Sequence, residues 1–146
     1  MGSLVETIKN PEQRKAVVAD CDKLIQEEVS AKKGLSGMAV KSAFKMIRSF
    51  KPDIVPNAME DLLDEFAEKI DPYWQECQQQ GANPESYFAA NDKKIANSLL
   101  TVTDGRAQKS KHKILVKAYN GLRGKAVAHI SAAMPRFSKL VVKHAS

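Results

Sequence analysis

The sequence is poor in cysteine and has no long apolar run. Cys21 and Cys77 are its two cysteines among 146 residues, and neither belongs to a C-x-x-C pair or a cysteine–histidine cluster. The common zinc motifs are therefore excluded, and two small apolar side chains that stay reduced are the simplest interpretation. No stretch approaches the roughly 18 apolar residues that span a bilayer, and the first residues lack the pattern of a signal peptide. We expect a cytoplasmic protein without a membrane span.

Catalytic and phosphate-binding motifs are also missing. The chain has neither of the glycine-rich phosphate loops, and GLSG at 34–37 lacks the spacing of a nucleophile elbow and the strand before it. His112, His129 and His144 match no metal-ligand spacing, and the carboxylates over 60–68 lack the Glu-x-x-His partners of a two-metal site. We therefore predict no catalytic residue, no metal and no cofactor, and the sequence favours a protein that is not an enzyme.

The composition is that of a folded domain with unevenly placed charge. Apolar residues make up 43% and charged residues 27%, and the length suits a single domain over residues 1–146. Residues 1–73 carry 11 basic and 13 acidic side chains, a net charge of −2, and residues 74–146 carry 12 and 4, a net charge of +8. Such asymmetry is typical of polyanion binding, or of two halves that face each other within one chain or across a dimer.

The first third of the chain contains residues that are typical of helix starts and helix ends. Ser3-Leu-Val-Glu6 is a capping-box pattern and predicts a short first helix. Asn10-Pro11 places a capping side chain before a proline, which predicts a helix over 11–33. We expect Gly34 to end that helix, Ser36 to cap the next one, and Pro52 to stop it.

The middle of the chain continues the pattern. An unbroken apolar stripe runs through Asp71-Pro72, which predicts two nearly collinear pieces over 57–81 that end at Gly81. Asn83-Pro84 opens either one long helix or two short ones, for which Gly105 is the expected end. The patch SLLTVTD is β-prone, but helical signals surround it.

Residues 105–146 contain ten Lys and Arg and no Asp or Glu. A disordered polycation lacks periodic apolar residues, whereas this segment has an apolar stripe at helical spacing from Leu115 to Leu140. We therefore expect it to fold, with a break near Gly124 or a kink at Pro135. The sequence as a whole predicts an all-α, helical-bundle-like single domain of about six to seven helices. Its expected central side chains are Phe44, Leu63, Phe66, Trp74, Tyr119, Leu122, Ile130 and Phe137.

The basic side chains outside the apolar stripe form a candidate surface for a partner. We expect a solvated face, with nucleic-acid phosphates as an alternative and an acidic protein or anionic lipid as another. No motif for base recognition supports binding to nucleic acid. Binding to anionic lipid would require large exposed apolar side chains beside the lysines. A fourth interpretation places the acidic line from Glu60 to Glu68 against this surface. The members of the candidate basic surface are Arg106, Lys109, Lys113, Lys117, Arg123, Lys125, Arg136, Lys139 and Lys143.

Four stretches carry a resemblance: VVADCDKLIQEEVSAKKGLSGMAVKSAFKMI, LLDEF, LLTVTDGRA and LRGKAVAHISAAMPRFSKL. Together they resemble a small bacterial family of uncharacterised helical proteins, a domain of unknown function, over nearly the whole chain. The resemblance implies a bacterial cytoplasmic source and a single all-helical domain. It implies no reaction, cofactor or catalytic residue, and it marks GLSG, TDGRA and LRGKA as the stretches to inspect first.

Three functions therefore stay open. The opposite-signed halves favour a binding or scaffolding protein that self-associates into a homo-oligomer. The basic C-terminal helices favour sequence-independent binding of nucleic acid as an alternative. A small-ligand carrier or enzyme with a site between helices is the third. Ser36 and Gly37, at an expected helix start, form a candidate anion site.

Overall fold

The computed structural model describes residues 3–145, and every regular element in that range is an α-helix. The predicted all-α class is therefore confirmed, with more helices than the six to seven expected. The described helices are α1 (Leu4–Thr7), α2 (Pro11–Ala31), α3 (Gly34–Phe50), α4 (Ile54–Gln80), α5 (Pro84–Ala90), α6 (Asp92–Lys109), α7 (Lys113–Arg123), α8 (Ala126–Ala132) and α9 (Met134–Ala145). None of them is long and apolar enough to cross a membrane.

The predicted helix starts are formed by the expected side chains. The Ser3 hydroxyl accepts a hydrogen bond from the Glu6 amide at 3.0 Å, which confirms the capping-box start of α1. The Asn10 side chain accepts from the Gln13 amide at 3.1 Å, and Asn83 accepts from the Ser86 amide at 3.1 Å. Each asparagine satisfies an amide that has no partner within its helix, and the following proline occupies a position that needs no donor.

The turn between α2 and α3 differs from the prediction. Gly34 takes a left-handed φ of 73°, but it begins α3 instead of ending α2. Lys33 occupies the N-cap position without a side-chain bond, so the prediction that Ser36 caps this helix is wrong. The physical reason is a close approach: a Cβ added to Gly37 would lie 2.7 Å from the carbonyl carbon of Lys32. The first turn of α3 therefore packs directly on the end of α2.

The prolines and glycines of the middle segment act as expected, with one exception. Helix α4 runs through Pro72 without interruption, as the continuous apolar stripe predicts. Gly81 ends α4 with a φ of 62°. Asn91 separates α5 from α6, and its side chain donates to the Tyr87 carbonyl at 2.9 Å. The expected end at Gly105 is wrong, because α6 continues to Lys109 and tolerates the roughly 1 kcal/mol that a helical glycine costs.

The basic C-terminal segment folds, as its periodicity predicts, and it breaks twice. Helix α7 ends at Arg123 beside Gly124, and a second boundary lies at Ala133, just before Pro135. Pro135 is the second residue of α9, where a missing backbone donor costs nothing. The two breaks and the separation at Asn91 account for the higher number of helices.

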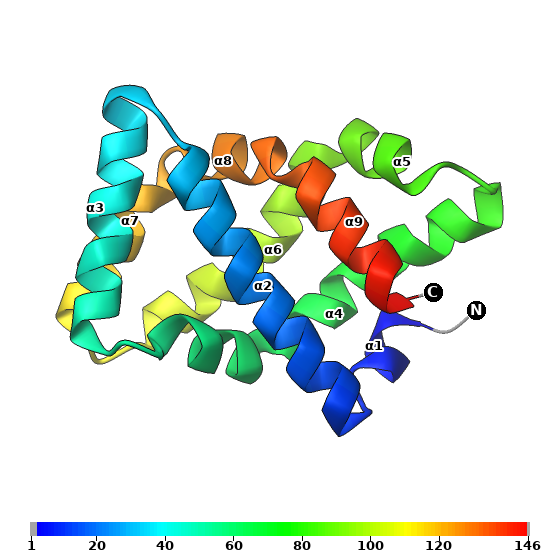
Figure 1. Ribbon diagram of the computed structural model, residues 1–146, viewed down its shortest axis with the longest axis horizontal. Helices are drawn as coiled ribbons and strands as arrows, with labels where there is room; N and C mark the ends of the chain where they lie inside the picture. The colour runs from blue at the N-terminus through cyan, green and yellow to red at the C-terminus, as the bar shows by residue number, and fades with distance from the viewer. Residues whose placement is uncertain (1–2, 146) are drawn as a thin grey trace.

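The helices surround a common interior (Figure 1). In this view α2 and α9 cross the front, α4 and α6 run behind them, and α3 and α7 lie at the left end. Helix α5 packs on α9 at the opposite end. One cluster of buried side chains lies at the α5–α9 end, with Trp74 and Phe88 among its members, and a second joins α1, α2 and α4 around Val17 and Leu63.

Candidate functional site

A cavity of about 400 Å³ lies between the helices. Helices α2, α3, α4, α6, α7, α8 and α9 all contribute to its wall, and α1 closes one edge. The wall is apolar. Seven of the eight residues expected at the centre of the domain line it: Phe44, Leu63, Phe66, Tyr119, Leu122, Ile130 and Phe137.

The interior is therefore only partly filled. Leu63 and Trp74 are buried, with 5% and 3% of their surface exposed, as predicted for central residues. The other six are only half-buried, and all of them line the cavity. Apolar stripes predict which face of a helix points inward, and here that inward face borders a space.

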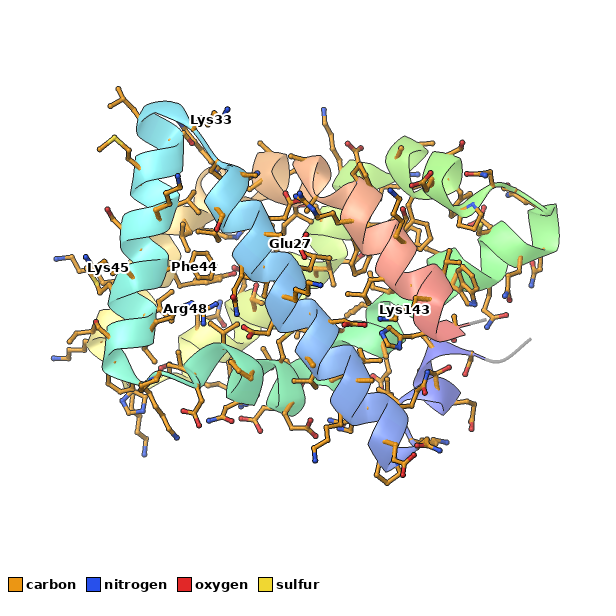
Figure 2. The ribbon with its side chains drawn as sticks, in the orientation of Figure 1. Glu27, Lys33, Phe44, Lys45, Arg48 and Lys143 are labelled. Atoms are coloured by element: carbon orange, nitrogen blue, oxygen red, sulfur yellow. The ribbon has the colours of Figure 1, made fainter. Side chains whose placement is uncertain are left out.

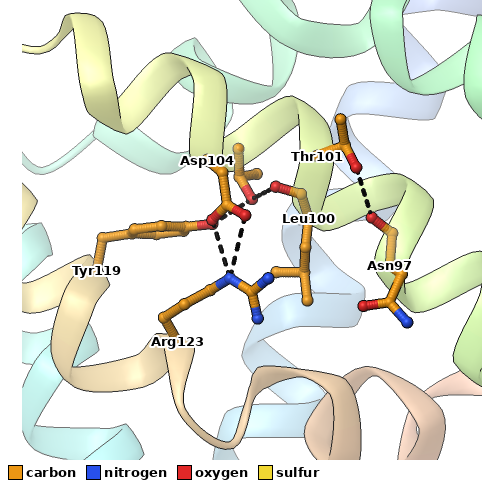
Figure 3. Close-up of polar contacts among 7 residues, drawn as sticks. Asn97, Leu100, Thr101, Asp104, Tyr119 and Arg123 are labelled. Atoms are coloured by element: carbon orange, nitrogen blue, oxygen red, sulfur yellow. Dashed lines mark hydrogen bonds and ion pairs between the residues drawn. The ribbon is translucent and has the colours of Figure 1, made fainter.

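Polar side chains on the cavity wall bond to the protein and not into the space. The Tyr119 hydroxyl donates to the Asp104 carboxylate and lies 2.7 Å from the Thr103 hydroxyl. Arg123 Nε lies 2.9 Å from the same carboxylate, so α7 is joined to α6 (Figure 3). Burial and the bond to Asp104 raise the pKa of Tyr119 to about 12. The Arg123 guanidinium and the Tyr119 hydroxyl lower the pKa of Asp104.

A charged group borders the cavity where α2 meets α9. The Glu28 carboxylate accepts from the Arg136 guanidinium, and Lys32 Nζ lies 3.8 Å from its other oxygen. Arg136 Nε also lies 3.3 Å from Glu27 Oε2. Glu28 and Lys32 contribute their aliphatic carbons to the wall, while their charged ends pair beside it.

A second charged group links α2 to the end of α9. Asp20 Oδ2 lies 2.8 Å from Lys143 Nζ and 2.7 Å from His144 Nε2. The bond from Lys143, followed by that from His144, lowers the pKa of Asp20. Next to it, Cys21 lines the cavity, and burial raises the pKa of its thiol to about 11. Cys21 and Cys77 are both free thiols, and a thiol with a raised pKa is a weak nucleophile.

His129 on α8 differs from the other polar side chains of the wall. Its imidazole lines the cavity and has no hydrogen-bond partner among residues 3–145. Burial, and then the charges of Lys32 and Lys125, lower its pKa, so the ring is neutral at neutral pH. The ring borders the space through its carbon atoms, because the surface that the wall exposes to the cavity is apolar.

The residues of the predicted basic surface differ in whether they pair with carboxylates of the chain. Four of its nine residues, Lys109, Lys113, Lys117 and Lys125, form no ion pair with the described part of the chain. The other five pair with carboxylates: Arg106 with Asp61, Arg123 with Asp104, Arg136 with Glu27 and Glu28, Lys139 with Glu85, and Lys143 with Asp20.

The acidic line of α4 is paired mainly with another helix. Arg14 of α2 lies 3.0 Å from Asp64 and also contacts Glu60. Only Asp61 of that line pairs with a residue of the predicted basic surface, at 3.1 Å from Arg106. The opposite charges therefore meet within one chain, and self-association stays a prediction.

At the candidate anion site at the start of α3, one of the two backbone amides bonds within the chain. Ser36 lies in the first turn of α3, and the Gly37 amide donates to the Lys33 carbonyl at 3.2 Å. Across residues 3–145 no three His, Cys, Asp or Glu side chains lie together in a way that could hold a metal ion. The cavity is thus the most developed site in the described structure. The sequence offered a site between helices only as a third alternative and without residues, because an apolar stripe looks the same on a packed helix and on a cavity wall.

Comparison with known proteins gives a family but no activity. The chain belongs to a family of unknown function, DUF6918, whose model matches residues 4–145. This confirms the predicted membership of an uncharacterised family over nearly the whole chain. No curated protein and no solved structure matches the sequence.

Proposed function

We propose that this member of a family of unknown function binds an apolar small molecule in the cavity between its helices. The observation that carries the proposal is the volume of about 400 Å³ bordered by an apolar wall. Small-molecule sites are typically cavities of this order, mostly apolar, with a few polar groups that orient the ligand. A bacterial cytoplasmic setting stays part of the proposal and is supported by the resemblance noted above.

The free energy of an unfilled cavity supports an occupant. Side chains that border unfilled apolar space lose packing contacts, which lowers the stability of the fold. A ligand that fills the space restores such contacts, and part of the energy gained then appears as affinity.

The wall also indicates the chemistry of the ligand. An apolar cavity of about 150 Å³ holds one benzene molecule, so this cavity accommodates roughly 12–18 carbon atoms. Because the wall hydroxyls of Thr103 and Tyr119 bond to each other and to Asp104, they offer little to a polar ligand. The surface that the wall exposes to the cavity is apolar, which favours a molecule that is itself apolar.

The experiment is a titration with N-phenyl-1-naphthylamine, an apolar dye whose fluorescence rises in an apolar environment. Protein first extracted with organic solvent and refolded is expected to bind one dye per chain with saturation. Mass spectrometry of the extract is expected to show an apolar compound released by the native protein. A dye signal that rises linearly with concentration and never saturates would contradict the proposal.

A further inference from the structure

The end of the molecule formed by α3 and α7 exposes apolar side chains to solvent. Across residues 3–145 the exposed large hydrophobic side chains all lie on these two helices: Leu35 at 88%, Met38 at 65%, Ile114 at 53%, Met46 at 45% and Phe50 at 43% exposure. The opposite face of α3, which includes Val40 and Phe44, lines the cavity. A helix that is apolar on both faces is normally covered on both, so the outer face of α3 lacks a partner.

Unpaired lysines surround these apolar side chains. The sequence contains no Asp or Glu over 29–52 or over 105–123. Arg48 turns inward to Asp22 at 3.4 Å, whereas Lys45 points away from the body of the molecule (Figure 2). The lysines of these two segments that form no ion pair with residues 3–145 are Lys33, Lys41, Lys45, Lys51, Lys109, Lys111, Lys113 and Lys117.

The two helices present these groups together. Helices α3 and α7 pack on each other at one end of the molecule (Figure 1). The Phe50 ring at the end of α3 contacts the His112 ring before α7, with centroids 4.9 Å apart. Lys51 follows Phe50 in the chain, and Lys111 and Lys113 flank His112. Apolar and cationic side chains therefore share one end of the fold.

We propose that the α3–α7 end docks on the surface of an anionic lipid membrane. Leu35 and Met38 would enter the headgroup region, and the lysines would meet the lipid phosphates. Nucleic acid would use the lysines but leave the exposed Leu and Met side chains without a partner. A second copy of the same face would bring two sets of unpaired lysines together and is disfavoured by like-charge repulsion. The anionic membrane satisfies both the apolar and the charged groups.

This inference goes beyond the proposed ligand binding and connects with it through α3. The outer face of α3 would lie on the membrane while its inner face borders the cavity. An apolar ligand could then pass between bilayer and cavity past a single helix. Docking itself needs no ligand, so the two proposals fail separately.

The experiment is flotation of the full chain with vesicles, at low and high salt. The vesicles are phosphatidylcholine alone, or phosphatidylcholine containing phosphatidylglycerol. The variants are Leu35→Ser with Met38→Ser, and Lys41→Gln with Lys45→Gln. Lys93→Gln with Lys94→Gln on α6 removes the same charge from exposed positions outside α3 and α7 and is the matched control. Circular dichroism checks that every variant is folded.

We expect binding to the anionic vesicles alone, weakened by salt. Each α3 double variant should lower the affinity by about tenfold or more. The α6 control, and the variant Ala126→Phe that adds a ring at the cavity wall, should bind like the original chain. Absence of flotation, or flotation that neither α3 variant weakens, would overturn the proposal. So would binding to DNA that depends on the lysines and not on Leu35 and Met38, or a dimer in sedimentation that the Leu35 and Met38 changes dissociate.

Discussion

Tyr119 on α7 donates the hydrogen of its hydroxyl to Asp104 on α6, directly at the wall of the cavity. Arg123, one turn further along α7, binds the same carboxylate with Nε 2.9 Å from Oδ1 (Figure 3). Two bonds from one helix to one side chain of another restrict how far the helices can separate. We infer that this contact holds α7 in place as part of the wall.

The first prediction concerns the alkaline stability of this contact. The pKa of Tyr119 is raised to about 12 in the folded protein, whereas an unfolded tyrosine ionises near pH 10. A group whose pKa is raised by folding contributes stability below its unfolded pKa, and that contribution is lost between about pH 10 and pH 12. Tyr119→Phe should remove this pH dependence and cost about 1 kcal/mol at neutral pH, as measured by urea unfolding at several pH values.

The variant Asp104→Asn tests the same bond between Tyr119 and Asp104 by a second measurement. Without the carboxylate, the absorbance titration of tyrosinate should show Tyr119 ionising at lower pH than in the original chain, because one cause of its raised pKa is gone. An unchanged titration curve in Asp104→Asn would mean that the bond between the two side chains does not exist in solution.

The second prediction concerns His129. Burial lowers its pKa below the ordinary value of 6.5, so the folded state favours the neutral ring. The stability that this provides is fully present above pH 6.5 and is lost as the pH falls through the lowered pKa. In His129→Gln the stability should fall less between pH 7 and pH 5, and the matched change His112→Gln at an exposed ring should leave the fall intact. Equal pH profiles for the two variants would contradict the placement of His129.

The third prediction compares two glycines of helical segments. Gly37→Ala would place a Cβ 2.7 Å from the Lys32 carbonyl carbon, which must push the start of α3 away from α2 and should cost about 1–3 kcal/mol. Gly121→Ala on α7 has no heavy atom within 4 Å of the added Cβ and should stabilise by about 0.5–1 kcal/mol. Thermal unfolding of both variants measures the contrast, and a stabilised Gly37→Ala protein would refute the close approach.

Local signals in the sequence predict most of the helix boundaries. The side chains of Asn10 and Asn83 and the left-handed Gly81 act within a few residues of their own positions, so a short window of sequence contains the whole cause. The start of α3 was misplaced because it depends on how two helix ends pack on each other. Gly37 lies against the Lys32 backbone at the end of α2, and the capping preference of Ser36 contains no information on that contact.

The cavity could not be predicted in the same way. The spacing of Phe44, Leu122 and Phe137 indicates which side of each helix turns inward, but not how far apart the inward sides lie. The distance between the inward sides depends on the contacts at the two ends of the molecule, where α3 packs on α7 and α5 packs on α9. The ion pairs could not be predicted from the sequence either. Counts of charged residues indicate two halves of opposite charge, but only the fold shows that Arg136 pairs with Glu28.

The most direct test of the central claim, that the interior holds an apolar ligand, compares two phenylalanine substitutions on α8. Ala126 lines the cavity, whereas Ala128 on the same helix is exposed. Dye titration of the solvent-extracted proteins should show at least about tenfold weaker binding for Ala126→Phe and unchanged binding for Ala128→Phe. The ligand-free Ala126→Phe protein should be at least as stable as the original chain, because the added ring fills empty space. Equal dye affinity in both variants would contradict the account.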